Sequence, residues 1–194
     1  MVWLIGYKGM LGSEIAKQLT ENKIDWIGSD KDVDITNPAE LSKFAHNHGT
    51  AAGRTGISVA RGTVPEKITW VINCAAYTAV DKAEEDSELA EKLNAEGPKN
   101  IARITRELGA KLIHISTDYV FDGTGNFPYT EDMLKCPDSV YGRTKAAGED
   151  FVEKEMTQYY ILRTAWLYGF NGKNFVYTMT KAMNSKDEVV RYLV

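Results

Sequence analysis

The sequence predicts a doubly wound α/β fold, in which helices cover both faces of a parallel sheet. Three observations carry this prediction. The chain opens on a short apolar run that ends in glycine at Gly6. A glycine-rich turn joins that run to the first helical pattern. Apolar runs and helical patterns then alternate along the chain, as right-handed strand–helix–strand units require.

The first elements follow from local pattern. Residues 2–5 form a continuous apolar run, which suits a strand buried on both faces. Apolar residues recur at helical spacing over residues 10–19, and residues 24–27 predict the second strand. Pro38 favours the first turn of a helix over residues 39–45. The other predicted strands are residues 69–74, 111–116 and 159–163, and the other predicted helices are residues 87–108, interrupted by Gly97-Pro98, 140–156 and 174–184.

Residues 46–66 break the alternation. The stretch has five glycines or prolines and no period, so we interpret it as a loop insertion. His46 and His48 lie in it, and two histidines without a third ligand do not predict a metal site. We expect a dinucleotide-binding domain over residues 1–170 and the beginning of a substrate-binding part over residues 171–194.

Composition excludes several classes of protein. The net charge of -4 and a pI of about 5.5 do not suggest nucleic acid or an anionic membrane as partner. No apolar run approaches a membrane span, and the N-terminus reads as a strand and not as a signal peptide. We therefore expect a cytoplasmic protein. Cys74 and Cys136 are expected to be free thiols, buried or half-buried.

The turn Gly6-Tyr7-Lys8-Gly9-Met10-Leu11-Gly12 is typical of a dinucleotide site. Gly6 takes the tight turn, Gly9 lets a pyrophosphate approach the backbone, and Gly12 lets the helix pack close to the sheet. The helix N-terminus then offers free N–H groups to the phosphates. Three spaced glycines are weak evidence alone, but their place at the first strand–helix junction favours a Rossmann-like cofactor site.

Asp30 lies just past the second predicted strand. An acid there accepts hydrogen bonds from the adenosine ribose and repels a 2′-phosphate, which favours NADH. The adjacent Lys31 would instead pair with a 2′-phosphate. Both residues also fit solvated loop positions. The cofactor is thus predicted as NADH or NADPH.

Tyr141 and Lys145 are four residues apart, which puts both on one face of a helix. An ammonium beside the phenol should lower the tyrosine's pKa and make it a proton donor and acceptor near neutral pH. Tyr177 and Lys181 have the same spacing. We choose the first pair because Ser116-Thr117 ends the preceding strand, where ligands bind in a parallel sheet, and we expect Tyr177 on a helix surface.

At this point the chain resembles the dTDP-4-dehydrorhamnose reductases. The matching segments are residues 34–36 (DIT), 74–84 (CAAYTAVDKAE), 116–123 (STDYVFDG), 141–145 (YGRTK) and 163–169 (RTAWLYG). The resemblance implies reduction of dTDP-4-dehydro-L-rhamnose to dTDP-L-rhamnose, for cell-surface polysaccharide. It implies a dTDP-sugar substrate and leaves a homodimer open.

The resemblance also implies residue roles. Thr117 would bind the keto oxygen, Tyr141 would protonate it, and Lys145 would hold the nicotinamide ribose and tune Tyr141. With the glycine turn and the acid, the predicted cofactor site is Gly6, Gly9, Met10, Leu11, Gly12, Asp30, Asp34, Ile35, Ala75, Ala76, Tyr77, Tyr141 and Lys145. The predicted substrate residues are Asp118, Tyr119 and Trp166. Alternatively, Ala75 and Ala76 are small core residues, Trp166 is ordinary core and Asp118 is a cap.

Two departures from the family qualify this prediction. Residues 46–66 are longer than the family pattern, and the chain ends at Val194, where the family continues into a part that completes the substrate pocket. We therefore expect the 194-residue chain to be inactive by itself. Two other functions stay open. One is a sugar-nucleotide epimerase or dehydratase of the same superfamily, and the other is a dinucleotide-binding regulatory subunit like that of methionine adenosyltransferase.

Overall fold

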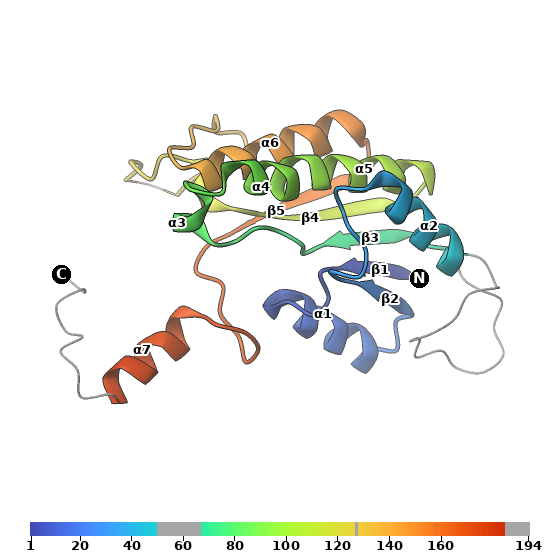
Figure 1. The fold of residues 1–194 in the computed structure, drawn as a ribbon, viewed down its shortest axis with the longest axis horizontal. Helices are drawn as coiled ribbons and strands as arrows, with labels where there is room; N and C mark the ends of the chain where they lie inside the picture. Colours follow the sequence, from blue (N-terminus) through green and yellow to red (C-terminus); the bar gives the residue numbers. More distant parts are fainter. Residues whose placement is uncertain (50–66, 127, 185–194) are drawn as a thin grey trace.

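The computed structural model describes residues 1–49, 67–126 and 128–184, and it contains a five-stranded parallel sheet (Figure 1). The strands are Val2–Ile5 (β1), Trp26–Ser29 (β2), Trp70–Asn73 (β3), Lys111–Thr117 (β4) and Tyr159–Thr164 (β5), in the order β2-β1-β3-β4-β5. The order reverses between β1 and β3, which creates the crevice where such sheets bind ligands. The predicted doubly wound α/β fold is confirmed.

The helices are distributed over both faces of the sheet, as Figure 1 shows. They are Met10–Glu21 (α1), Pro38–Gly49 (α2), Val80–Ala83 (α3), Ser87–Glu91 (α4), Gly97–Glu107 (α5), Val140–Glu155 (α6) and Phe175–Asn184 (α7), with a π-helical turn at Lys92–Glu96 and a 3₁₀ turn at Asp118–Val120. One face is covered by α2, α5 and α6, and α1 lies against the other. In the same view α7 stands away from the sheet on the side of α1.

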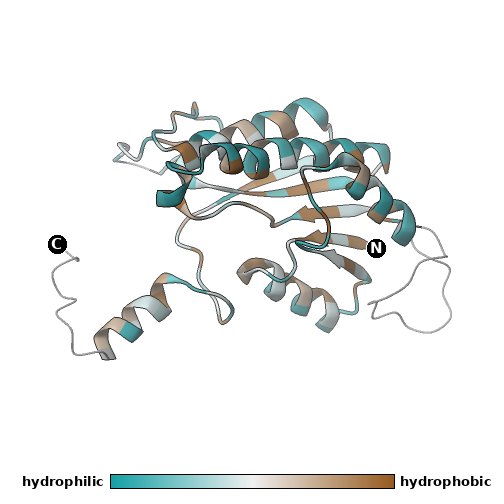
Figure 2. Cartoon of the chain, viewed as in Figure 1, coloured by the Kyte–Doolittle hydropathy of each residue, from teal (hydrophilic) through white to brown (hydrophobic). Residues whose placement is uncertain are grey.

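The main core lies between the sheet and the α2, α5, α6 layer. Its strands carry apolar residues, while the helices show hydrophilic outer surfaces (Figure 2). Trp3 on β1 is fully buried, and its ring stacks on Phe44 of α2 at 5.1 Å between ring centroids. Its indole N–H donates to Ser29 Oγ at 2.9 Å, so the polar atom of this large core side chain is satisfied.

Apolar side chains of β5 and the segment after it are exposed. Among them, Trp166 is 75% exposed and Phe170 88% exposed. Others in the same part of the chain are Tyr160, Leu162, Leu167, Tyr168, Phe175, Val176 and Met183. So many exposed large apolar residues within one short segment mark a surface suited to packing against further protein.

Two of the predicted boundaries were wrong. The second strand begins at Trp26, because Ile24 lies in the preceding turn and is exposed. Helix α2 continues to Gly49, so the N-terminal end of the predicted loop insertion is helical. There His48 Nδ1 bonds the Phe44 carbonyl and its ring stacks on Phe44, which extends the helix by one turn. The rest of that insertion, residues 50–66, and residues 185–194 of the predicted substrate-binding part lie outside the described residues.

The interruption expected at Gly97-Pro98 is also wrong. The helical path from Ser87 to Glu107 is continuous, and its irregularity is the π-helical turn just before Gly97. Pro98 lies in the first turn of α5, where the missing N–H is tolerated. A Cβ on Gly97 would lie 2.6 Å from Ile35 Cδ1, so this glycine allows close packing. Among the cysteines, Cys136 is exposed, contrary to expectation, because it lies in the surface loop before α6.

No helix in the described ranges combines the length and the apolar character that crossing a bilayer requires. Within those ranges, no three His, Cys, Asp or Glu side chains are arranged as metal ligands.

Candidate functional site

The glycine turn has three glycines with different roles. Gly6 has φ +76°, and a Cβ there would lie 2.9 Å from the Ala75 nitrogen. A Cβ on Gly12 would lie 2.1 Å from the Gly6 carbonyl oxygen, so Gly12 allows α1 to pack onto the turn. A Cβ on Gly9 has no neighbour nearer than 3.3 Å. The protein itself therefore requires glycine at positions 6 and 12, while Gly9 leaves free space beside its backbone.

That free space opens into a cavity of about 820 Å³ at the carboxyl ends of β1 and β3. Seven predicted cofactor residues line it: Gly6, Gly9, Asp30, Asp34, Ile35, Ala75 and Ala76. Lys8, Val33 and Leu93 also line it and were not predicted, and Lys31 was predicted only as an alternative phosphate partner. Met10, Leu11 and Gly12 form the first turn of α1 and do not line the cavity.

The cavity suits a dinucleotide. Helix α1 begins beside it at Gly9, with no acid in its first turn, so its free N–H groups can receive a pyrophosphate. Lys8 adds a cation at the same end, while Val33, Ile35 and Leu93 provide an apolar wall for a planar base. A close backbone approach, a helix N-terminus and an apolar wall are the features that bind such a group.

The two predicted acids differ in their contacts. Asp30 accepts the Lys8 N–H at 3.2 Å on one oxygen and the Lys31 N–H at 2.8 Å on the other, which holds the carboxylate at the cavity wall. Asp34 uses one oxygen within a turn, where it accepts both the N–H and the hydroxyl of Thr36 at 2.8 Å. Asp30 is thus fixed in a position to bind ribose hydroxyls, and Asp34 mainly shapes the loop.

The Thr117, Tyr141 and Lys145 side chains meet where β4 ends and α6 begins. Thr117 ends β4 and caps the 3₁₀ turn, accepting the Tyr119 N–H at 3.2 Å. Tyr141 lies in the first turn of α6, which Ser139 caps through the Gly142 N–H at 3.0 Å. Lys145 is 2% exposed, and its Nζ donates to the Ile115 carbonyl at 2.7 Å. The predicted convergence of a strand-end hydroxyl with a tyrosine helix is therefore present.

The expected pKa of Tyr141 was wrong. Burial raises this pKa above its usual value, and the hydrogen bond with Thr117 offsets only part of that rise. The Lys145 ammonium is directed at the Ile115 carbonyl, so it does not stabilise a phenolate here. Tyr141 is thus protonated at neutral pH, the state that a proton donor needs.

A second cavity, of about 500 Å³, lies beside the 3₁₀ turn that follows β4. Asp118, Tyr119 and Trp166 all line it, together with Phe121, Asp122, Gly123, Asp138 and Ser139. The Tyr119 ring meets the Tyr141 ring edge-on, with 5.5 Å between the ring centroids, and this contact connects the cavity to α6. Trp166 has φ +51° and is largely exposed, so the alternative of an ordinary core tryptophan is wrong. Asp118 accepts the Thr117 hydroxyl at 3.1 Å, and Thr117 is the cap.

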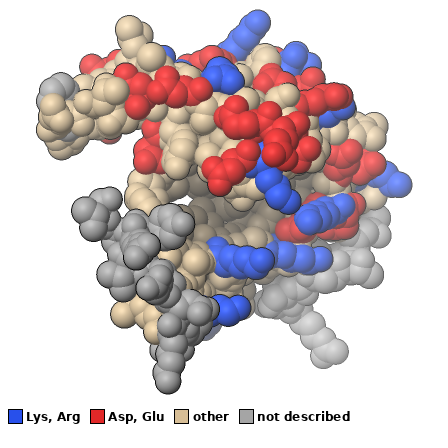
Figure 3. Space-filling model, turned by 60° about the vertical axis from the view of Figure 1, so that its left-hand side comes forward, with Lys and Arg blue, Asp and Glu red and all other residues tan. Residues whose placement is uncertain are grey.

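The molecular surface is hollowed between the sheet body and the segment that leads to α7. Figure 3 shows this hollow, with Asp and Glu side chains gathered above it and Lys or Arg side chains along its lower side. Tyr177 lies on α7, and its hydroxyl donates to the Phe170 carbonyl at 3.3 Å. It is 47% exposed, as expected for a helix-surface residue.

Asn94 is a buried polar residue that the sequence analysis missed. It lies in the π-helical turn, and its side chain binds both backbone groups of Tyr77, accepting the N–H at 2.8 Å and donating to the carbonyl at 3.0 Å. It also donates to Thr144 Oγ1 at 3.2 Å, and Thr144 in turn donates to the Tyr141 carbonyl. Asn94 thus joins the loop after β3 to the catalytic helix. The one signal in the sequence was an asparagine inside a long helix, where its propensity is low.

The same contacts explain the position of Tyr77. Its backbone is held by Asn94, and its hydroxyl donates to Asp86 Oδ2 at 2.9 Å, away from the cofactor cavity. Tyr77 therefore lines neither cavity, unlike its neighbours Ala75 and Ala76.

Replacing Asn94 by alanine should lower the free energy of unfolding by about 1–3 kcal/mol, because it leaves both buried backbone groups of Tyr77 without partners. Urea unfolding followed by circular dichroism measures this. Asn22→Ala, which removes one exposed bond to the Gln18 carbonyl, should change stability by less than about 0.5 kcal/mol. Equal effects of the two substitutions would contradict the role of Asn94.

Comparison with known proteins identifies the family. A profile of the RmlD substrate binding domain matches residues 1–191. The chain belongs to this family. The RmlD-family chain is 40% identical over 192 residues to the dTDP-4-dehydrorhamnose reductase of Streptomyces griseus, covering 97% of this chain and 57% of that protein. It is 44% identical over 184 residues to a probable dTDP-4,6-dihydroxy-2-methyloxan-3-one 4-ketoreductase of Streptomyces antibioticus, covering 92% and 56%.

A solved structure agrees with these relatives. The dTDP-4-dehydrorhamnose reductase of Bacillus anthracis, crystallised in complex with NADP, superimposes with a TM-score of 0.82 at 36% identity, covering 94% of the RmlD-family chain and 59% of that structure. The resemblance seen in the sequence is thus confirmed at the level of family and fold. The chain spans little more than half the length of these relatives.

Proposed function

We propose that this chain is the dinucleotide-binding part of a reductase that converts dTDP-4-dehydro-L-rhamnose to dTDP-L-rhamnose with NADH or NADPH. The observation that carries the proposal is that Thr117, Tyr141 and Lys145 gather at the end of β4, in the same sheet whose β1 and β3 ends open on a cavity with the features of a dinucleotide site. The Tyr141 ring also contacts Tyr119, which lines the second cavity together with Asp118 and Trp166. Residues 1–170 would then bind the cofactor, and residues 171–194 would begin the part that binds the sugar nucleotide.

The roles of the side chains follow from their positions. Thr117 and Tyr141 present hydroxyl groups at the same point, so both can donate to a ketone oxygen and stabilise the developing negative charge. Tyr141, protonated at neutral pH, then supplies the proton. Lys145 lines neither of these cavities, and its proposed role is to reach a ribose hydroxyl of the bound dinucleotide with the ammonium that bonds the Ile115 carbonyl. The bound dinucleotide would supply the hydride, and the protein would orient it.

Two related functions make different predictions. An epimerase or dehydratase of this superfamily tends to retain its nicotinamide through the cycle, so the purified protein would carry tightly bound NAD. A regulatory subunit would bind dinucleotide without turnover and would copurify with a partner. The decisive assay is oxidation of NADH or NADPH that depends on added dTDP-4-dehydrorhamnose, in a protein extended to the length of its relatives. Absence of turnover there, with binding intact, would reject the reductase proposal.

For the 194-residue chain itself we expect dinucleotide binding but little or no reduction of the sugar. The cofactor cavity is built from residues of this chain. Remote contacts to the nucleotide of the substrate supply much of the energy for positioning the ketone, and in the family we expect those contacts to come from the further C-terminal part. The exposed apolar residues of positions 160–183 should also cause self-association. Fluorescence titration, a spectrophotometric assay and light scattering test the three expectations. Rapid turnover by a monodisperse sample would contradict the second expectation. It would mean either that a partner chain completes the substrate pocket or that the pocket needs no further segment.

A further inference from the structure

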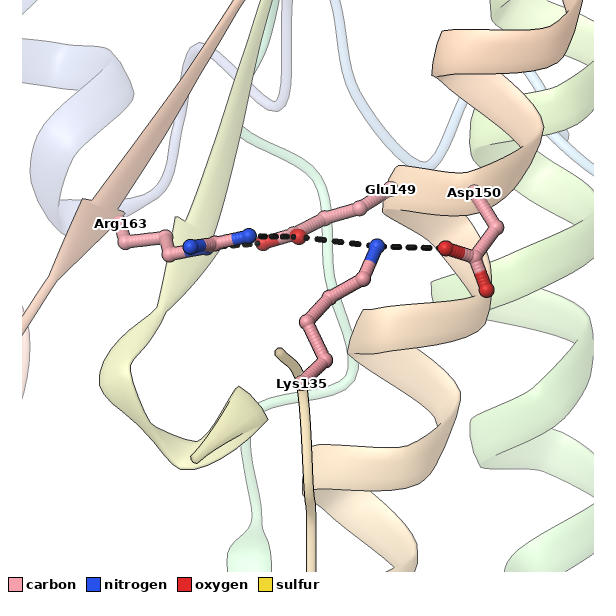
Figure 4. Close-up of polar contacts among 4 residues, drawn as sticks. All are labelled: Lys135, Glu149, Asp150 and Arg163. Carbon is pink, nitrogen blue, oxygen red and sulfur yellow. Dashed lines mark hydrogen bonds and ion pairs between the residues drawn. The ribbon is translucent and has the colours of Figure 1, made fainter. Parts of the chain in front are cut away.

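A cluster of charges surrounds one buried carboxylate of α6, and it consists of Glu149, Arg163, Lys135 and Asp150 (Figure 4). Glu149 is its buried member, whereas Arg163 and Lys135 are partly exposed and Asp150 is exposed. Glu149 on α6 is fully buried. Arg163 on β5 donates to both of its carboxylate oxygens, from Nε at 3.0 Å and from Nη2 at 2.7 Å. Lys135, from the loop before α6, lies 3.4 Å from Glu149 Oε2 and also pairs with Asp150. The Glu149 carboxylate thus links α6, β5 and the loop before α6.

This environment keeps Glu149 ionised. Burial alone would raise the pKa of its carboxyl, but the hydrogen bonds from Arg163, with the charges of Arg163 and Lys135, hold it below the usual value. The two-pronged contact with a guanidinium is the strongest pairing that a carboxylate makes with a side chain. Glu149 therefore carries a permanent negative charge in the interior.

Lys145 lies one helical turn before Glu149 on the same face of α6. Its ammonium is buried, with Tyr141 on the same helix, Cys74 after β3 and His114 on β4 as the other titratable groups around it. Burial raises the pKa of the Cys74 thiol to about 12 and lowers that of His114 well below its ordinary value, so both are neutral at pH 7. Tyr141 is neutral too. Among the described residues, Glu149 is thus the ionised acid whose charge bears on Lys145.

We propose that Glu149 is a positioning residue that holds Lys145 as an ammonium ion beneath the cofactor site, with Arg163 and Lys135 fixing the carboxylate in place. This inference rests on the proposed function, in which Lys145 binds the nicotinamide ribose beside Tyr141. An ammonium donates every one of its hydrogens and accepts none, so a charged Lys145 can bind the Ile115 carbonyl and a ribose hydroxyl at the same time.

Stability alone does not account for the arrangement. Buried ion pairs contribute little net stability, because desolvation offsets their attraction. The same helix already has a carboxylate that anchors it: Glu155, at its far end, pairs with Arg103 and Arg106 of α5 at 2.9 and 2.6 Å. Glu155 holds α6 against α5 without contacting the site, and it provides a matched control for Glu149.

The test is the titration of Lys145 in the 194-residue protein, followed by NMR of ¹³Cε-labelled lysine from about pH 6 to about pH 11. A Lys145→Gln spectrum identifies its resonance. In the wild-type protein burial lowers the pKa of Lys145 from 10.5 to about 8. Glu149→Gln keeps the shape and removes the charge, and we expect it to lower that pKa further, by roughly one unit or more. Glu155→Gln should leave it unchanged.

The direction of the shift separates the two explanations. If Glu149 only supported the fold, its replacement would loosen α6, admit water to Lys145 and raise the pKa toward 10.5. A rise, or no change, in Glu149→Gln would therefore overturn the proposal. Should that variant fail to fold, the double variant Glu149→Gln/Arg163→Gln removes both charges of the pair. Because the loss of the Arg163 cation partly offsets the loss of the carboxylate, a smaller downward shift of the Lys145 pKa is expected, and a rise would overturn the proposal. Since the titration needs neither dinucleotide nor sugar, its failure is distinguishable from failure of the reductase proposal.

Discussion

Tyr141→Phe should lower the rate of ketone reduction by about 10²–10⁴-fold, the range that general acid catalysis contributes. The substitution removes one oxygen and leaves the ring, which is nearly buried and meets Tyr119 edge-on, so the local packing is kept. Dinucleotide affinity should stay nearly unchanged, because Tyr141 does not line the cofactor cavity. Steady-state kinetics in a protein of the full family length, with fluorescence titration of the dinucleotide, measures both quantities.

The matched control is Tyr177→Phe. Tyr177 has the same spacing to a lysine, but its hydroxyl binds a backbone carbonyl on the surface of α7. Its loss should be close to silent in both measurements. If Tyr177→Phe were the inactive variant and Tyr141→Phe the active one, the choice between the two tyrosine and lysine pairs would be wrong.

Gly9→Val should weaken dinucleotide binding by at least about 10-fold, equivalent to about 1.4 kcal/mol. A side chain at this position enters the space where the pyrophosphate meets the N-terminus of α1. The fold should be retained, because a Cβ there has one close neighbour, the Gly6 carbonyl oxygen at 3.3 Å, and a shift of a few tenths of an ångström relieves that contact. Isothermal or fluorescence titration with NADH and NADPH gives the affinity, and circular dichroism checks the fold.

Two other glycines serve as controls for this prediction. Gly169 has ordinary contact distances around a Cβ and lies outside the cofactor cavity, so Gly169→Val should bind dinucleotide normally. Gly12→Val should destabilise the whole protein, because its Cβ would lie 2.1 Å from a backbone oxygen. Unchanged affinity in a folded Gly9→Val protein would rule out this cavity as the dinucleotide site.

The fold was predictable because its signals are local. Short apolar runs, helical periods and a glycine turn at the first junction depend on residues that are close in sequence. The same holds for the spacing of Tyr141 and Lys145, which one helix fixes. Element ends were less predictable. Helix α2 continues to Gly49, into the stretch whose glycine-rich composition predicted a loop, and in its last turn the His48 ring stacks on Phe44.

The state of the site depended on contacts between distant segments. Spacing alone suggested that Lys145 acts on the phenol of Tyr141, whereas the folded chain directs its ammonium to Ile115 on β4. The structure also shows that Asn94 joins the loop after β3 to α6. Its partners are Tyr77, 17 positions earlier in the sequence, and Thr144, 50 positions later. Neither result can be read from a motif, because each needs the packing of α6 against the sheet.

The sequence by itself thus determined the α/β class, the family and the segments that carry the chemistry, since these follow from local periodicity and short motifs. Only the tertiary structure decided which of those residues line a cavity, which have side chains that hydrogen-bond within a turn, and which charged groups lie together in the interior. The physical reason is that burial, together with the hydrogen bonds and charges that packing brings to each group, sets the ionisation of Tyr141, Lys145 and Glu149. Burial is a property of the assembled layers and of no single segment.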